Sequence, residues 1–192
     1  MKLPTLLFLM FYLSQSLYAQ LKYEKEYRIS SDEVAQEALD FFSVLHTKFR
    51  IKWFREESID RNSLEAKFKH SGNSYSVEFN EEGEIEDIEV TIELSDIPAE
   101  VQQKITTYLN SHFLKHKLCK VQRQYSGDRA SLQNLLSSNT KDDSGTQLIK
   151  YELVVKVRTD EGRKELEMLF GSNGELESQS RIVEKNTDNL EF

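Results

Sequence analysis

Apolar and polar positions alternate along most of this chain, as they do in β-strands that bury one face. The alternation begins at Phe49 and returns in runs that are separated by short polar segments. The runs cover residues 49–53, 64–68, 75–79, 85–92, 119–121, 151–157, 166–170 and 176–183. Gly83 and Gly174 each follow such a run, where a glycine is typical of a hairpin turn with positive φ. The pattern therefore predicts antiparallel hairpins.

Two segments have helical spacing instead. The first opens with Ser30-x-x-Glu33, a capping box in which the side chains of both residues satisfy free backbone N–H groups. Apolar residues follow it at positions 34, 35, 38, 39, 42 and 45. The second opens at Ser95 to Pro98, with proline in the first turn, where its missing N–H has no cost. Its apolar stripe is formed by residues 101, 105, 108, 109, 112 and 113.

The order of these elements, a helix followed by strands, occurs twice. The best internal match aligns Val77 to Ile85 with Met168 to Leu176, including the glycine before the final Glu. We therefore expect an α+β fold: a tandem repeat of helix plus antiparallel strands, with the two helices packed on one face of an antiparallel sheet. The repeats are predicted at 20–94 and 95–192, and the second contains an insert at 126–147.

The N-terminus has the layout of a secretory signal peptide. Lys2 is followed by an apolar run from Leu3 to Leu13, which is about half the roughly 20 residues that a membrane-spanning helix needs. We expect cleavage after Ala19, and therefore a leader at 1–19 and a periplasmic or extracellular protein. A buried core element is the alternative. No cysteine stands directly after the expected cut, which argues against a lipid anchor. We also expect no membrane insertion after cleavage.

Charge narrows the range of partners. The formal net charge is −8, and it becomes −9 when the leader, with Lys2, is removed. Such a surface repels phosphate backbones and anionic membranes, so we expect no nucleic-acid partner.

The residues around the second helix and its hairpins resemble the PepSY-like exported proteins, which are similar in fold to the beta-lactamase-inhibitor protein. The resemblance lies in Ser95 to Val101, Tyr151 to Leu153 and Lys164 to Leu176. It implies a periplasmic or secreted module whose relatives include protein inhibitors. The first repeat departs from it, since Val34 stands near the place of the helix-start proline. No contact motif is matched, so no inhibitory residue is carried over.

Recognisable catalytic motifs are missing from the sequence. It contains no dinucleotide or phosphate-binding glycine motif, no Gly-x-Ser-x-Gly and no Cys-x-x-Cys. We therefore expect no enzyme and no cofactor. His112 and His116 have metal-ligand spacing, but no third ligand is apparent, and we interpret His112 as a packed helix residue. Cys119, the only cysteine, is predicted to face inward beside Val121 as an inert thiol.

The segment 78–96 is strongly acidic and leaves alternatives open. Alternation places many of its carboxylates on the solvent face of a strand, which is the interpretation we favour. A cation site is possible, although the loop pattern of a calcium site is missing. Dispersed carboxylates of a hydrolase are a further alternative.

Two surfaces are predicted to contact a partner. Phe54, Val154 and Leu169 are apolar residues on the sheet face that the helices leave open, and an apolar cluster rimmed by charge is typical of a binding hot spot. Scattered surface hydrophobes are the alternative. In the insert, Leu132, Leu135 and Leu136 have the spacing of one helical turn that either docks back or binds a partner; a disordered insert is the alternative.

From these observations we expect a non-catalytic binding or inhibitor-type module that recognises a protein or peptide through the open sheet face and its loops. The alternatives are an envelope protein that senses a ligand or cation through the acidic strand at 78–96, and a hydrolase with dispersed carboxylates.

Overall fold

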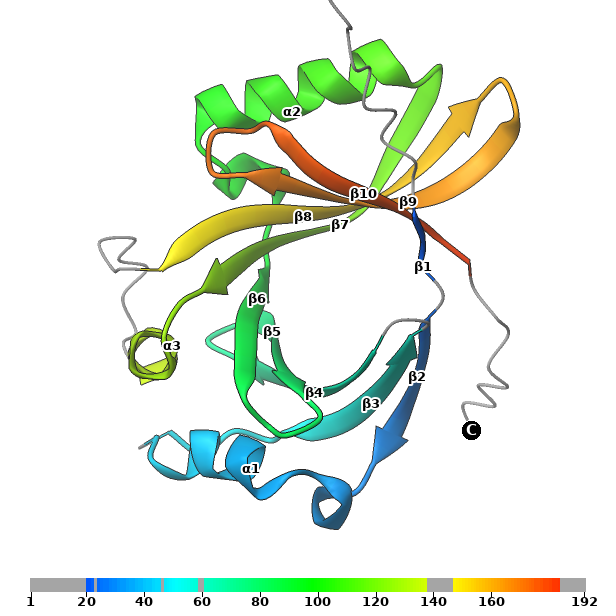
Figure 1. The fold of residues 1–192 in the computed structure, drawn as a ribbon. Helices are drawn as coiled ribbons and strands as arrows, with labels where there is room; N and C mark the ends of the chain where they lie inside the picture. Colours follow the sequence, from blue (N-terminus) through cyan, green and yellow to red (C-terminus); the bar gives the residue numbers. More distant parts are fainter. Residues whose placement is uncertain (1–19, 23, 46, 59–60, 138–146, 184–192) are drawn as a thin grey trace, which may run out of the picture.

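Ten strands form one continuous, strongly bent sheet in the computed structural model of the chain (Figure 1). The structure describes residues 20–22, 24–45, 47–58, 61–137 and 147–183. The expected leader at 1–19 lies outside them. Within the described ranges, no helix combines the length and apolar character that crossing a bilayer requires.

The elements follow in an order that matches two successive helix-plus-strands segments. They are β1 Gln20–Lys22, β2 Glu24–Ile29, η1 Ser31–Glu33, α1 Gln36–Ser43, β3 Lys52–Ser58, β4 Asn62–His70, β5 Asn73–Asn80, β6 Ile85–Thr91, η2 Leu94–Asp96, α2 Ala99–His112, β7 Lys115–Ser126, α3 Arg129–Ser137, β8 Leu148–Thr159, β9 Gly162–Gly171 and β10 Leu176–Ile182. The order η–α–four strands appears twice, with α3 inserted after the first strand of the second segment. That the two segments are copies of one unit, with a boundary at 94/95, stays a prediction.

The strand order across the sheet is β1-β10-β9-β8-β7-β6-β5-β4-β3-β2. Strands β2 to β10 pair antiparallel with their sequence neighbours, as the hairpin pattern predicted. Strand β1 is the exception, because it pairs parallel with β10. The fold is therefore α+β with an antiparallel sheet of nine strands and one short parallel addition.

Both helix starts involve a capping arrangement. The Ser30 N–H donates to Glu33 Oε2 at 3.0 Å, and this capping box heads the short helix η1, after which α1 begins only at Gln36. In the second segment the N–H of Glu93 donates to Asp96 Oδ2 at 3.0 Å, and Pro98 stands at the N-cap of α2. A single turn of 3-10 helix thus precedes each α-helix, and α1 begins later than the capping box at Ser30 predicted.

Helix α1 covers the β3–β6 half of the sheet with aromatic side chains. Phe41 is fully buried and meets Phe79 edge-to-face, with ring centres 5.5 Å apart. Phe42 meets Trp53 in the same way at 5.8 Å. Such edge-to-face pairs add to the stabilisation that comes from burying the rings.

Helix α2 covers the other half. Ile105 and Leu109 pack in one cluster with Leu153, Met168 and Phe170. The two clusters lie on the same face of the sheet, because directly paired residues link them: Ile88 of the first cluster stands opposite Tyr125, which stands opposite Ile149, and Ile149 touches both clusters.

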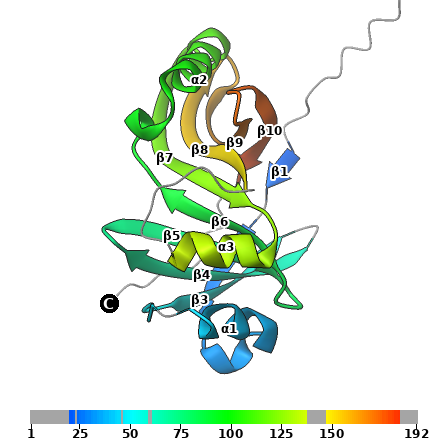
Figure 2. The ribbon, with the colours of Figure 1, turned by 90° about the vertical axis from the view of Figure 1, so that its left-hand side faces the viewer.

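A third helix, α3, joins this layer and changes the expected picture of two helices. It lies on the outer side near β6 and α1 (Figure 2). Arg129 fixes its start, since its guanidinium donates to Glu37 Oε1 at 2.6 Å. The insert is therefore helical at 129–137, and its remaining residues at 138–146 lie outside the described part.

The glycine of the β5–β6 turn provides a test of helix–sheet contact. Gly83 has φ +88°, and a Cβ there would lie 2.7 Å from the backbone N of Ala38 in α1. Gly83→Ala should therefore lower the free energy of unfolding by more than the roughly 1–2 kcal/mol that a left-handed conformation alone costs. Gly72→Ala is the matched control, because Gly72 has φ +85° with open space around it. Urea unfolding of both variants measures the difference, and equal losses would contradict the contact.

Candidate functional site on the uncovered sheet face

The face of the sheet that carries no helix is lined by polar and charged side chains. Figure 1 shows the β7–β10 half and the β2–β6 half bending toward each other across it. The bend buries groups that a flat sheet would expose: Glu65 is 8 %, Glu89 4 % and Gln122 2 % exposed. We call this the concave face. Buried polar groups need partners, so their environment decides what the face can bind.

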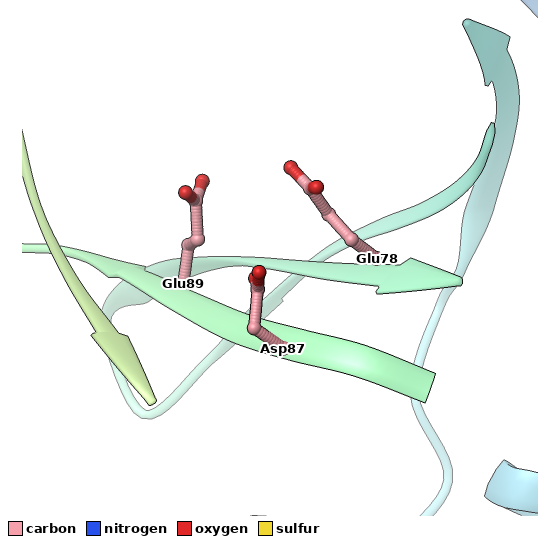
Figure 3. A group of neighbouring side chains, drawn as sticks. All are labelled: Glu78, Asp87 and Glu89. Carbon is pink, nitrogen blue, oxygen red and sulfur yellow. The ribbon is translucent and has the colours of Figure 1, made fainter. Parts of the chain in front are cut away.

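Three carboxylates converge on the concave face (Figure 3). Glu78 lies on β5, and Asp87 and Glu89 lie on β6. One oxygen from each can be chosen so that all lie within 4.8 Å of one another. Glu78 is directly opposite Asp87 in the strand pairing, a like-charge arrangement that destabilises a sheet. We refer to these residues as the acidic trio.

Two glutamines of β7 hold the trio from one side. Gln122 Nε2 donates to Glu89 Oε2 at 2.6 Å, and Gln124 Nε2 donates to Asp87 Oδ2 at 3.0 Å. Two oxygens of these hydrogen-bonded side chains lack a donor. Within the described residues, Asp87 Oδ1 and Gln122 Oε1 are buried and accept no hydrogen bond. Leaving a buried acceptor without a donor costs about 1–3 kcal/mol.

Burial also changes the protonation of the trio. Burial raises the pKa of Glu78 well above its usual range, and the neighbouring Asp87 carboxylate adds to the rise. Burial likewise raises the pKa of Glu89, helped by Glu152 and Glu78. The pKa of Asp87 rises to about 7, mainly through burial and then through Glu86. Carboxylic acids with raised pKa values exchange protons near neutral pH.

A cavity of about 770 Å³ lies at one end of the concave face. Its lining combines six basic residues with a single acidic one, Glu65. The basic residues are Lys48, Arg50, Lys52, Lys67, Lys69 and Lys120. Lys67 is engaged with Glu65 at 2.9 Å and with Glu26 at 2.5 Å. A chain of negative net charge thus concentrates positive charge at this cavity, which we call the basic cavity.

The predicted apolar contact residues all lie on the concave face, but not as one cluster. Val154 stands opposite Glu167, and Leu169 stands opposite Glu152, so the two apolar side chains are diagonal neighbours on β8 and β9. Phe54 lies on β3, with strands β4 to β7 between it and β8. The ammonium group of Lys67 lies 4.9 Å from its ring centre.

The leucines of the insert are core residues. Leu132 is fully buried and Leu136 is 3 % exposed, both in the cluster beneath α1, and Leu135 packs partly buried against that cluster. Of the two roles predicted for this helical turn, docking back against the sheet is the one observed. Leu132 and Leu136 are therefore unavailable for a partner in this structure, and their prediction as contact residues is wrong.

Two other predictions also fail, for local reasons. Cys119 is exposed, because a β-bulge between Leu118 and Lys120 interrupts the alternation that would have turned it inward. His112 and His116 do not share a helix, since α2 ends at His112 and His116 belongs to β7. His112 is exposed and stacks on Tyr108 with ring centres 3.9 Å apart, so it is not a packed core residue.

Sequence reasoning located the carboxylates of 78–96 on the uncovered face but missed their convergence. Solvent exposure was the favoured interpretation, whereas Glu89 is 4 % exposed. The turn at Gly83 pairs Phe79 with Ile85, and regular pairing from there would place Glu86 opposite Glu78. An irregularity between Glu78 and Phe79 shifts the register and brings Asp87 opposite Glu78 instead. The bend of the sheet, which desolvates the trio, has no local signature in the sequence.

The raised pKa of Asp87 predicts a dependence of stability on pH. Between the usual value of 3.8 and about 7, the folded state retains a proton that the unfolded state has lost. The free energy of unfolding should therefore fall as pH rises from about 4 to about 7, at about 1.4 kcal/mol for each full unit of pKa difference. Asp87→Asn should flatten this slope and be the more stable protein above pH 7. Urea unfolding across this pH range is the measurement, with exposed Glu100→Gln as control. A slope retained by Asp87→Asn would contradict the assignment.

Comparisons with known proteins return similarity of structure alone. No protein-family model matches the chain, and no curated protein sequence matches it. Among solved structures, the chain is similar to a DUF2874 family protein from Bacteroides ovatus, with a TM-score of 0.49 and 14 % identity over 77 % of this chain and 87 % of that one. It is also similar to a BLIP-like protein from Bacteroides fragilis, with a TM-score of 0.48 and 14 % identity over 83 % of this chain and 92 % of that one.

Proposed function

We propose that this protein is a non-catalytic binding module of the cell envelope that recognises a protein or peptide through the concave face. The observation that supports this most is the basic cavity, which gathers six cationic side chains beside a single carboxylate in a chain of net negative charge. The signal peptide predicted at 1–19 supports the location in the envelope or outside the cell.

The chemistry of the basic cavity favours an acidic partner segment. Lys52 and Lys120 lie on strands at opposite sides of the cavity, and within the described residues neither has a hydrogen bond or ion pair. Carboxylates of an acidic segment in the cavity would gain a charge-assisted hydrogen bond at each lysine. The partner's acidic side chain is therefore expected to enter here, with binding that weakens as salt is raised.

Apolar contacts complete the proposed surface from both sides of the concave face. Val154 and Leu169 form a pair on the β8–β9 side, and Phe54 lies on the β3 side. A segment that lies along the face meets apolar side chains on both flanks and charge at the end. This combination of apolar anchors with a charged rim is the usual composition of a protein-binding hot spot.

The raised pKa values of the acidic trio are the observation that would favour the alternative function, a hydrolase. A hydrolase needs a substrate-sized cavity in contact with its acid and base. The basic cavity is lined by Glu65, Ser76 and Gln122 but by none of the three trio carboxylates. Non-catalytic binding is therefore the function that this geometry supports best.

Charge reversal in the basic cavity tests the proposal. Lys52→Glu combined with Lys120→Glu should lower affinity for the physiological partner at least tenfold, since two attractive contacts become repulsive. Affinity capture from an envelope and secreted fraction of the source organism, quantified by mass spectrometry, is the measurement. Proteins retained by the wild type should be lost from the double variant and should elute with salt.

Arg163→Glu combined with Arg158→Glu is the matched control, because it makes the same charge change in a different basic hollow, on β8 and β9. Proteins that bind through the basic cavity should stay bound to this control. A captured set that is the same for the wild type and the Lys52/Lys120 variant would overturn the assignment of this surface.

The apolar pair gives a separate prediction. Val154→Ala with Leu169→Ala should weaken binding of a captured partner by roughly tenfold, as loss of central apolar anchors does at other interfaces. Leu114→Ala is the control, because Leu114 is 68 % exposed and precedes β7. Titration calorimetry with the purified partner measures each affinity. Equal affinities for the two variants would show that Val154 and Leu169 are ordinary surface residues.

A further inference from the structure

We propose that the carboxylates of Glu78, Asp87 and Glu89, together with the amide oxygen of Gln122, bind one divalent cation of the calcium type. This site adjoins the basic cavity, whose lining includes Gln122, and goes beyond the proposed recognition of a partner. It rests on the arrangement of the trio, on the orientation of Gln122, and on the surrounding charges.

The spacing of the trio suits a hard cation of this size. Ca²⁺ takes six to eight oxygen ligands at 2.3–2.6 Å in flexible geometry, so ligands on opposite sides of the ion stand about 5 Å apart. The three carboxylate oxygens lie within 4.8 Å of one another, which allows all three to reach a single ion. Mg²⁺ requires ligands at about 2.1 Å in strict octahedral geometry and fits this spacing less well.

Gln122 provides an observation that is independent of the acidic residues. Its side chain is 2 % exposed, and its Nε2 donates to Glu89 Oε2 at 2.6 Å, which fixes the orientation of the amide. Its Oε1 belongs to the same amide group, is buried, and accepts no hydrogen bond from any described residue. A neutral carbonyl oxygen is a frequent calcium ligand, and a cation would satisfy it together with the unpartnered Asp87 Oδ1.

The charged groups around the trio do not neutralise its three carboxylates. Glu65 of β4 and Glu152 of β8 add to its negative potential, and Glu86 does so from β6 itself. Of the cations that act on it, Arg61 is paired with Glu86, and Lys150 is paired with Glu177 at 2.7 Å. Lys120 of β7 acts on Glu89 and also lines the basic cavity.

Protons and the cation compete for the same oxygens. Without a cation, burial raises the pKa values of all three acids, so protons relieve the repulsion. Ligand carboxylates bind a metal only when they are ionised. Binding should therefore release protons and should strengthen as pH rises above about 7, the pKa of Asp87.

Calcium titration of the isolated full-length protein tests the site, without any partner present. After treatment with a chelator and its removal, calorimetry at pH 8 should show one Ca²⁺ per chain, with weaker binding at pH 5.5. At a concentration about 100 times the dissociation constant, the melting temperature should rise by about 5 °C or more. Mg²⁺ at the same concentration should give a smaller shift.

Two variants and one control separate a built site from general attraction to acidic residues. Asp87→Asn and Gln122→Met should each lower calcium affinity at least tenfold, whereas Glu81→Gln with Glu82→Gln in the exposed β5–β6 turn should not. Asp87→Asn relieves repulsion, so its melting temperature in chelator should be no lower than that of the wild type, and loss of binding cannot then reflect unfolding.

The proposal would be overturned if millimolar Ca²⁺, in tenfold excess over the protein, produced neither a binding heat nor a shift in melting temperature. An equal response from Asp87→Asn would overturn it as well. Either result leaves the basic cavity and its partner untouched, because a variant at Lys52, on β3, reports on that cavity separately.

Discussion

The structure depends on one constraint: a single sheet buries one face under three helices and bends so that its other face is partly closed. The buried face is continuous from Phe79 beneath α1 to Phe170 beneath α2, which ties both halves into one layer. The bend that this packing maintains also removes water from carboxylates on the opposite face. Packing of the core on one face of the sheet is thus linked to raised carboxyl pKa values on the other face.

The separation of charge on the concave face follows from the same geometry. Acidic residues of β5 and β6 lie on this face and are desolvated. Basic residues such as Lys52 and Lys120 line a cavity at one end, where the face opens to solvent. A negative chain therefore offers positive charge to a partner, and its most perturbed acids are not part of the lining of that cavity.

Much of the fold could be predicted from alternation and capping, because both are local. The capping box at Ser30 and the inward direction of Leu153 and Met168 follow directly from short stretches of sequence. The failures have non-local or irregular causes. A one-residue bulge turned Cys119 outward, and a polar insert concealed a helix whose Leu132 completes a distant core. The convergence of the acidic trio needs strand register and curvature, which only the assembled sheet provides.

The parallel pairing of β1 with β10 has a consequence for assembly. β1 and β2 are separated by a single residue in the chain, yet they form the two opposite ends of the strand order. The stretch from Gln20 to Ile29 therefore supplies both outermost strands. An outermost strand that is exposed and regular is a template for adding strands from other molecules. Because one short stretch of backbone forms both margins of the sheet, a change in that stretch alters both of these templates at once.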